Sequence, residues 1–258
     1  MNKYFCFLLL FSNFIFISAC EKQNTSRGNQ LSDEKIEATI DDQINSSFYI
    51  SEISDEVFKI MQGRSYKDNC TLSRSKLRHL HVLHKNLEGK TCKGELVCNE
   101  KIAAITLDIF KELFKAGYPI EKIRLIDEYD ADDEKSMSDN NSSSFNFRFI
   151  SHTSTVSKHG LGMAIDINPL YNPYFKFVKG KENVEPEKGR LYLDRSKNFP
   201  YKIDHADLAY QLFTKAGFEW GGDWTDRKDF RHFELPTSVT EQYSEMYSGT
   251  YSDGSADI

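Results

Sequence analysis

The sequence predicts an α+β fold, with a small antiparallel sheet and flanking helices. Two segments have apolar residues at the spacing of a helix, and six short segments are strand-like, some of them with apolar and polar residues in alternation. The central part of the chain, roughly 190 residues, is long enough for one well-buried core. We therefore expect a single folded domain between two polar ends.

Both predicted helices have recognisable ends. Segment 100–116 carries apolar residues every three or four positions from Ile102 to Leu113, and a glycine and then a proline follow it. Segment 204–216 repeats this plan and also stops at a glycine. Asp204 is the expected N-cap of this second helix.

The expected strands are residues 80–84, 95–98, 123–126, 145–150, 162–167 and 232–235. In segment 145–150 the aromatic residues would face the core. Asn146 and Arg148 would then share the other face, either toward a site or toward solvent. Segment 127–143 is dense in Asp, Asn and Ser, and we expect a solvated connection there rather than the mobile rim of a cleft.

The most informative stretch is residues 157–166, which read S-x-H-x-x-G-x-A-x-D, and the sequence Asp-Phe-Arg-His follows at 229–232. Two histidines and one carboxylate form the ligand set of a catalytic zinc site, which keeps a fourth position open for water. The candidate ligands of one Zn²⁺ are His159, Asp166 and His232.

The local pattern supports these ligands. On a strand, residues i and i+2 share a face, so Asp166 lies beside Ala164 and Gly162, whose small size leaves room for a metal. His159 precedes this strand in a glycine-flanked turn that can fold it over the same face. On the second strand, His232 and Glu234 take the polar side.

A general base for the water is also present. Asp229 stands three residues before the last histidine, a spacing that favours it as the base. Asp223 and Asp226 lie in the same loop and are the alternatives, although turn chemistry accounts for both of them.

These residues resemble the zinc site of the M15 metallopeptidases, which include D-Ala-D-Ala carboxypeptidases and dipeptidases and L-Ala-D-Glu endopeptidases. The resemblance covers roughly residues 60–235 and is strongest to the family's subfamily C. The segments that are similar to this subfamily are 144–148, 164–169, 172–174, 192–195 and 220–224.

The resemblance implies a role for each matching residue. Three would bind zinc: His159, Asp166 and His232. Asp229 would be the catalytic base, and an Asp here favours the endopeptidase-like branch. Arg148 would polarise the scissile carbonyl or hold a substrate carboxylate, with Asn146 beside it as a second substrate-binding residue. Ser157 would form a hydrogen bond near the site or act as a plain turn serine.

The resemblance also implies an activity. The expected function is zinc-dependent hydrolysis of peptidoglycan stem peptides, by a D,D-carboxypeptidase or by an endopeptidase. The alternative is a non-catalytic cell-wall-binding lipoprotein that keeps the fold. This alternative predicts a lost ligand or base, whereas all four residues are present.

The N-terminus predicts export and lipid anchoring. A short basic start precedes an apolar run over residues 4–17, and Ile-Ser-Ala-Cys at 17–20 resembles a bacterial lipoprotein box. We expect a signal peptide at 1–19, a lipidated Cys20 with a polar tether to residue 48, the peptidase domain at 49–241 and a disordered tail at 242–258. The protein would then lie on the cell membrane or outer membrane and face the periplasm or cell wall.

Charge and cysteine content restrict the partners further. The net charge is −6 and Lys and Arg are spread along the chain, so no basic stripe indicates nucleic acid. We expect a monomer. The mature domain keeps three cysteines, which allow at most one internal bridge: Cys70, Cys92 and Cys98.

A second metal site is a further possibility. These cysteines could form one with three histidines of a single segment: His79, His81 and His84. Because His79 and His81 alternate with apolar residues, as on a strand, a solvated strand face is the favoured interpretation.

Overall fold

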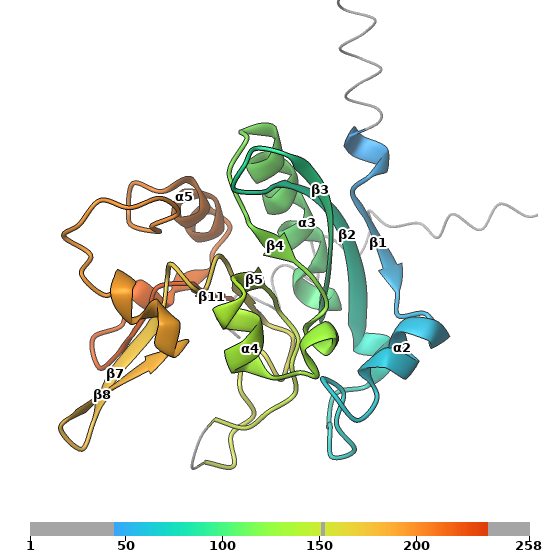
Figure 1. Cartoon of the computed structure of the whole chain (residues 1–258). Helices are drawn as coiled ribbons and strands as arrows, with labels where there is room; N and C mark the ends of the chain where they lie inside the picture. The colour runs from blue at the N-terminus through green and yellow to red at the C-terminus, as the bar shows by residue number, and fades with distance from the viewer. Residues whose placement is uncertain (1–43, 151–152, 237–258) are drawn as a thin grey trace, which may run out of the picture. The chain divides into compact units, whose positions relative to one another are not determined.

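The computed structural model describes residues 44–150 and 153–236. The predicted α+β class is confirmed: helices accompany several small antiparallel sheets and one parallel pair of strands (Figure 1). The expected signal peptide, Cys20, most of the tether and the C-terminal tail lie outside the described residues. Among the helices of the described ranges, none has the length and apolar composition that crossing a membrane requires.

The first sheet has the order β1-β2-β3 and is antiparallel; its strands are β1 (Tyr49–Glu52), β2 (Leu77–Lys85) and β3 (Thr91–Asn99). Helix α3 (Glu100–Lys115) begins where β3 ends, with Asn99 as N-cap, and it packs against β2. The main core lies at this contact, because Leu80 and Val82 of β2 join the buried face of α3. The helix predicted at 100–116 is therefore confirmed.

A second apolar cluster includes Leu77 of β2 and Val97 of β3. Helix α2 (Asp55–Met61) contributes Met61 to it, and the short 3-10 helix η1 (Arg74–Lys76) leads into β2. Phe145 and Phe147 also belong to this cluster. They pack the segment that precedes His159 against the first sheet.

The second sheet has the order β6-β11-β9, and its strands are β6 (Ala164–Asp166), β11 (His232–Glu234) and β9 (Glu219–Trp220). Helix α5 (Leu208–Lys215) is joined to it by Phe213, which stacks on Phe233 of β11 at 4.5 Å between ring centroids. The strands expected at 162–167 and 232–235 are thus present in shorter form.

Helix α5 begins later than the sequence predicts. Asp207 is the N-cap, and its side chain accepts a hydrogen bond from the backbone N of Ala209 at 2.9 Å. The Asp204 side chain instead accepts from the N of Ala206. The prediction that Asp204 caps the helix is wrong. Both aspartates accept a backbone hydrogen bond in a turn, but only the chain after Asp207 continues as a helix.

The third sheet has the order β10-β7-β8, and its strands are β10 (Lys228–Asp229), β7 (Tyr174–Val178) and β8 (Lys181–Glu185). The 3-10 helix η3 (Glu187–Tyr192) follows β8, and η4 (Gly221–Asp223) lies between β9 and β10. Pairing of Asp229 with Tyr174 fixes the backbone of the candidate base.

Segment 127–143 is not the expected solvated connection. It contains most of η2 (Ile126–Tyr129), all of α4 (Asp133–Ser138) and β5 (Asn141–Ser142), which pairs in parallel with β4 (Lys122–Ile123). Several of its polar residues are buried, and Asn141 shows why: its Oδ1 accepts from the N of Arg124 at 2.8 Å in place of a backbone partner. The strand expected at 123–126 is correspondingly reduced to β4.

The strand predicted at 145–150 is wrong as a regular element. Three consecutive N–H groups bond in three directions: Phe145 to Val97 O, Asn146 to His159 O and Phe147 to Ser65 O. Phe145 and Phe147 are buried as predicted, whereas Phe149 is 41% exposed. The segment therefore joins separate parts of the fold and extends no single sheet.

Asp207 gives a testable dependence of stability on pH. Burial raises the pKa of this carboxyl to about 6 from an ordinary 3.8, although the hydroxyl of Tyr118 and the N–H of Ala209 donate to it. Because the folded state holds the proton more tightly than the unfolded chain, this contribution to stability is present below about pH 4 and is lost as the pH rises through 6.

Asp207→Asn keeps a good N-cap and removes the charge. Between pH 4 and pH 7.5, the unfolding free energy of the natural protein should fall relative to that of the variant by up to about 3 kcal/mol. Urea unfolding across this range measures the difference, and a constant difference at every pH would contradict the assignment.

Candidate metal centre

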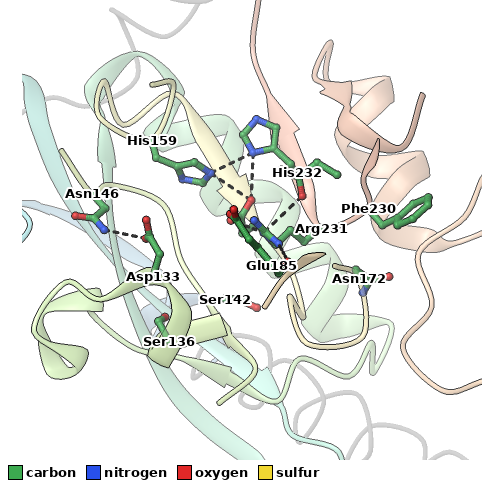
Figure 2. A network of polar contacts seen from close by, with 12 residues as sticks. Asp133, Ser136, Ser142, Asn146, His159, Asn172, Glu185, Phe230, Arg231 and His232 are labelled. Carbon is green, nitrogen blue, oxygen red and sulfur yellow. Dashed lines mark hydrogen bonds and ion pairs between the residues drawn. The ribbon is translucent and has the colours of Figure 1, made fainter. Parts of the chain in front are cut away.

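Three polar side chains converge at the edge between β6 and β11. Asp166 and His232 are directly opposite each other in the antiparallel register, and His159 reaches them from the turn before β6. The two imidazole rings point toward each other (Figure 2). All three residues are only 5–6% exposed.

One atom of each side chain contributes to a compact triangle. His159 Nε2 lies 3.1 Å from His232 Nδ1 and 3.3 Å from Asp166 Oδ1, and the third edge, from His232 Nδ1 to Asp166 Oδ1, is 3.2 Å. Ligands at about 2.0–2.1 Å from a tetrahedral zinc lie roughly 3.3–3.4 Å apart. The three atoms thus have the spacing of three corners of a tetrahedron.

The outer atoms of these side chains are held by other groups. His159 Nδ1 lies 2.7 Å from the carbonyl O of Ser144, and His232 Nε2 lies 3.0 Å from Glu234 Oε2. Both outer partners accept hydrogen bonds, so with a metal bound each outer nitrogen would carry the proton and each inner nitrogen would present a lone pair. The pattern of alternation placed Glu234 on the polar side of its strand, and here it orients His232.

The charge of the cluster also calls for a cation. Burial opposes ionisation of Asp166, but His159 and Arg231 hold the pKa of its carboxyl well below the ordinary range. Burial likewise disfavours protonated His232, yet hydrogen bonds to Asp166 and Glu234 raise its pKa to about 9. Inward-facing lone pairs beside a carboxylate attract either a proton or a metal ion, so the residues fit the predicted zinc.

The turn that carries His159 depends on two glycines. Gly160 packs so closely on the Arg148 backbone that a Cβ would lie 2.9 Å from the Arg148 carbonyl O. Gly162 has a φ of +65°, and its carbonyl accepts from the N of Asn99 at the end of β3. Ser157 Oγ accepts from the N of Gly160 at 3.0 Å, so in this structure Ser157 closes the turn.

Asp229 is the buried carboxylate beside this triangle. It is 8% exposed, and its Oδ1 has no hydrogen bond within the described part of the chain, although Arg231 Nε lies 3.5 Å away. Burial raises the pKa of its carboxyl, against the lowering effect of Arg231. The two alternative bases are exposed at the surface, where Asp223 contacts His205 and Asp226 contacts Arg227.

Arg231 is a site residue that the sequence analysis did not identify. Its Nε donates to Asp166 Oδ2 at 3.0 Å, and its Nη1 donates to the carbonyl O of Glu185 at 2.6 Å (Figure 2). Burial lowers the pKa of this guanidinium, but the carboxylates of Asp229 and Asp166 raise it by more. Arg231 therefore joins the candidate base to a candidate ligand, and the only signal for it was a charged residue between Phe230 and His232.

Asn146 and Arg148 share a partner that the sequence did not indicate. Asn146 Nδ2 donates to Asp133 Oδ1 at 2.8 Å, and Arg148 Nε lies 2.6 Å from Asp133 Oδ2. Figure 2 shows the Asn146 side chain directed at Asp133, not at the imidazoles. Both residues thus lie together beside the start of α4, where Asn146 is hydrogen-bonded to Asp133 and Arg148 forms an ion pair with it.

A surface cavity lies beside the cluster. It has a volume of about 290 Å³, and its lining includes Trp220, Asp223 and Trp224. The ring centroid of Trp224 is 5.3 Å from that of His232. A ligand in this cavity would thus be next to the aromatic neighbour of a candidate metal ligand.

Comparison with protein families supports the interpretation of the motifs. Residues 151–235 match a family model of the M15 group that is described as D-alanyl-D-alanine carboxypeptidase. This match confirms the resemblance to M15 peptidases, and the matched segment contains His159, Asp166, Asp229 and His232. Neither a curated protein nor a solved structure matches the chain significantly.

Proposed function

We propose that this chain, which carries an M15 peptidase segment over residues 151–235, is a zinc-dependent peptidase that hydrolyses peptidoglycan stem peptides. The observation that carries the proposal is the buried triangle of His159 Nε2, Asp166 Oδ1 and His232 Nδ1, with the Asp229 carboxylate beside it. The family match supports a hydrolase, and two histidines with one carboxylate are ligands that suit zinc.

Each side chain has a defined part in hydrolysis. A zinc ion bound at the triangle would act as a Lewis acid toward a peptide carbonyl and would lower the pKa of a water molecule bound to it. Asp229 takes a proton from the attacking water and delivers it to the departing amine. Arg231 Nε lies 3.5 Å from Asp229 Oδ1 without a hydrogen bond to it and donates to Asp166 instead, so Asp229 keeps an oxygen for this transfer.

Arg148 is the proposed substrate-binding cation. Its guanidinium is held by Asp133 through Nε, and its side chain is 35% exposed, so it can reach a ligand in solvent. There it would stabilise charge on the scissile carbonyl oxygen or bind the terminal carboxylate of a stem peptide. Asn146 supports it through the same aspartate, and Ser157 contributes through the turn that carries His159.

The proposed location is the bacterial envelope. The apolar N-terminal run and the small residues before Cys20 support cleavage at that cysteine and its lipidation. An exported enzyme on the cell membrane or outer membrane would face peptidoglycan directly. Palmitate labelling of the natural chain, and its loss in Cys20→Ser, tests this part of the proposal.

Digestion of purified muropeptides by the full-length protein tests the activity. With zinc we expect cleavage of the stem peptide, and a chelator should abolish it. Mass spectrometry separates the two possible peptidases: loss of a terminal alanine indicates a D,D-carboxypeptidase, and release of the stem at L-Ala indicates an endopeptidase. Absence of cleavage by zinc-loaded protein would favour the alternative, a non-catalytic wall-binding lipoprotein.

A further inference from the structure

A second set of metal-binding groups lies on the first sheet, away from the M15 motif. His79 and His81 are two residues apart on β2, so they share one face of that strand. Glu95 of β3 is the direct cross-strand partner of His81. One nitrogen of each histidine and one carboxylate oxygen of Glu95 all lie within 4.8 Å of one another.

The spacing of these atoms is close to that of a metal site. His79 Nε2 lies 3.4 Å from Glu95 Oε2, and His81 Nδ1 lies 3.8 Å from Glu95 Oε1. These distances end at two different oxygens of one carboxylate. Ligands of a tetrahedral zinc are separated by roughly 3.3–3.4 Å, so the first distance already fits, and a rotation of the Glu95 carboxylate would have to bring one oxygen toward both imidazoles. The exposed Glu95 can make this movement, since its side chain is 49% exposed.

His79 supplies an independent observation that points to a ligand. Its side chain is only 6% exposed, and its Nε2 is a buried polar atom without a hydrogen-bond partner in the described part of the chain. Glu95 is the nearest acceptor, but the contact lacks hydrogen-bond geometry. A buried polar atom that is left unpaired costs about 1–3 kcal/mol, and a metal ion at this position would remove that cost.

We propose that His79, His81 and Glu95 form a second site for a divalent transition metal of the zinc class. Tyr49 of β1 stacks on His81 with ring centroids 4.1 Å apart, which holds that imidazole over the sheet. The metal would link β2 to β3 and keep a position open to solvent on the Glu95 side. The cysteines do not take part as the sequence first suggested: Cys92 contacts the carbonyl O of Lys90, and Cys98 belongs to the core on the helix side.

Zinc counting by competition with a chromophoric chelator tests the second site in the purified full-length protein. The natural protein should bind two equivalents, and His81→Ala should bind one. His159→Ala, which removes a ligand of the first site, should also bind one, and the double variant should bind none. Glu95→Gln should weaken the second equivalent by more than about 10-fold, because changes outside the ligand shell already cost 10- to 100-fold.

His205→Ala is the matched control, since it removes a histidine that contacts a single carboxylate, Asp223. This variant should keep two equivalents. A count of one in the natural protein that falls to none in His159→Ala, or two equivalents with unchanged affinity in both His81→Ala and Glu95→Gln, would overturn the second site. Because the count needs no substrate, a protein without peptidase activity that still binds two zinc ions would refute the proposed function alone.

Discussion

Asp229→Ala is expected to keep the fold and the bound zinc and to lose peptidase turnover by about 10²- to 10⁴-fold, the usual contribution of a general base. The candidate ligand atoms belong to His159, Asp166 and His232, so removal of the Asp229 carboxylate leaves the triangle complete. It also removes a buried carboxyl group whose pKa is raised by burial. Steady-state cleavage of a muropeptide, together with zinc content and circular dichroism, measures the three properties.

Asp226→Ala is the control for this experiment. Asp226 precedes the strand β10 that contains Asp229 and is also a carboxylate. It forms ion pairs with Arg227 and Lys176 at the surface. Its replacement should leave kcat within about twofold, as is usual for a surface change that touches no functional group. Full activity of Asp229→Ala, or a large loss in Asp226→Ala, would require another base.

The parts of the fold that were predictable are those whose own pattern decides the structure. Helix α3 was predictable from the spacing of its apolar residues and from the glycine after it. Strands β6 and β11 were predictable because apolar and polar residues alternate around Ile165 and Phe233. The candidate ligands were identified from the spacing of the S-x-H-x-x-G-x-A-x-D segment and of the later Asp-Phe-Arg-His. These signals are local, so tertiary contacts strengthen them and do not reverse them.

The parts that were missed depend on contacts between distant segments. Asn141 looked like a loop residue, yet it is buried because its amide replaces backbone partners of Arg124. The sequence carries no signal for the role of Arg231, because that role exists only where Asp166 and Asp229 come together from different strands. His79 and His81 were expected on a solvated strand face. The pattern within their own strand does not reveal that Glu95 of the neighbouring strand lies beside them.

Arg231→Met is expected to lower the unfolding free energy of the metal-free protein by about 3–5 kcal/mol, the cost of removing one partner from a buried ion pair. Arg231 is 4% exposed and contacts both Asp166 and Asp229, so methionine leaves two buried carboxylates without their shared cation. Urea unfolding in excess chelator measures this loss without a contribution from zinc binding.

The matched comparison is Arg124→Met, which removes an arginine from an exposed ion pair. The side chains of Arg124 and Glu128 are 55% and 52% exposed at a separation of 3.3 Å, and such pairs contribute about 0–1 kcal/mol. The two variants therefore differ in the burial of the lost charge and not in its type. Equal stability losses would mean that Arg231 does not balance the charge of the buried carboxylates of Asp166 and Asp229.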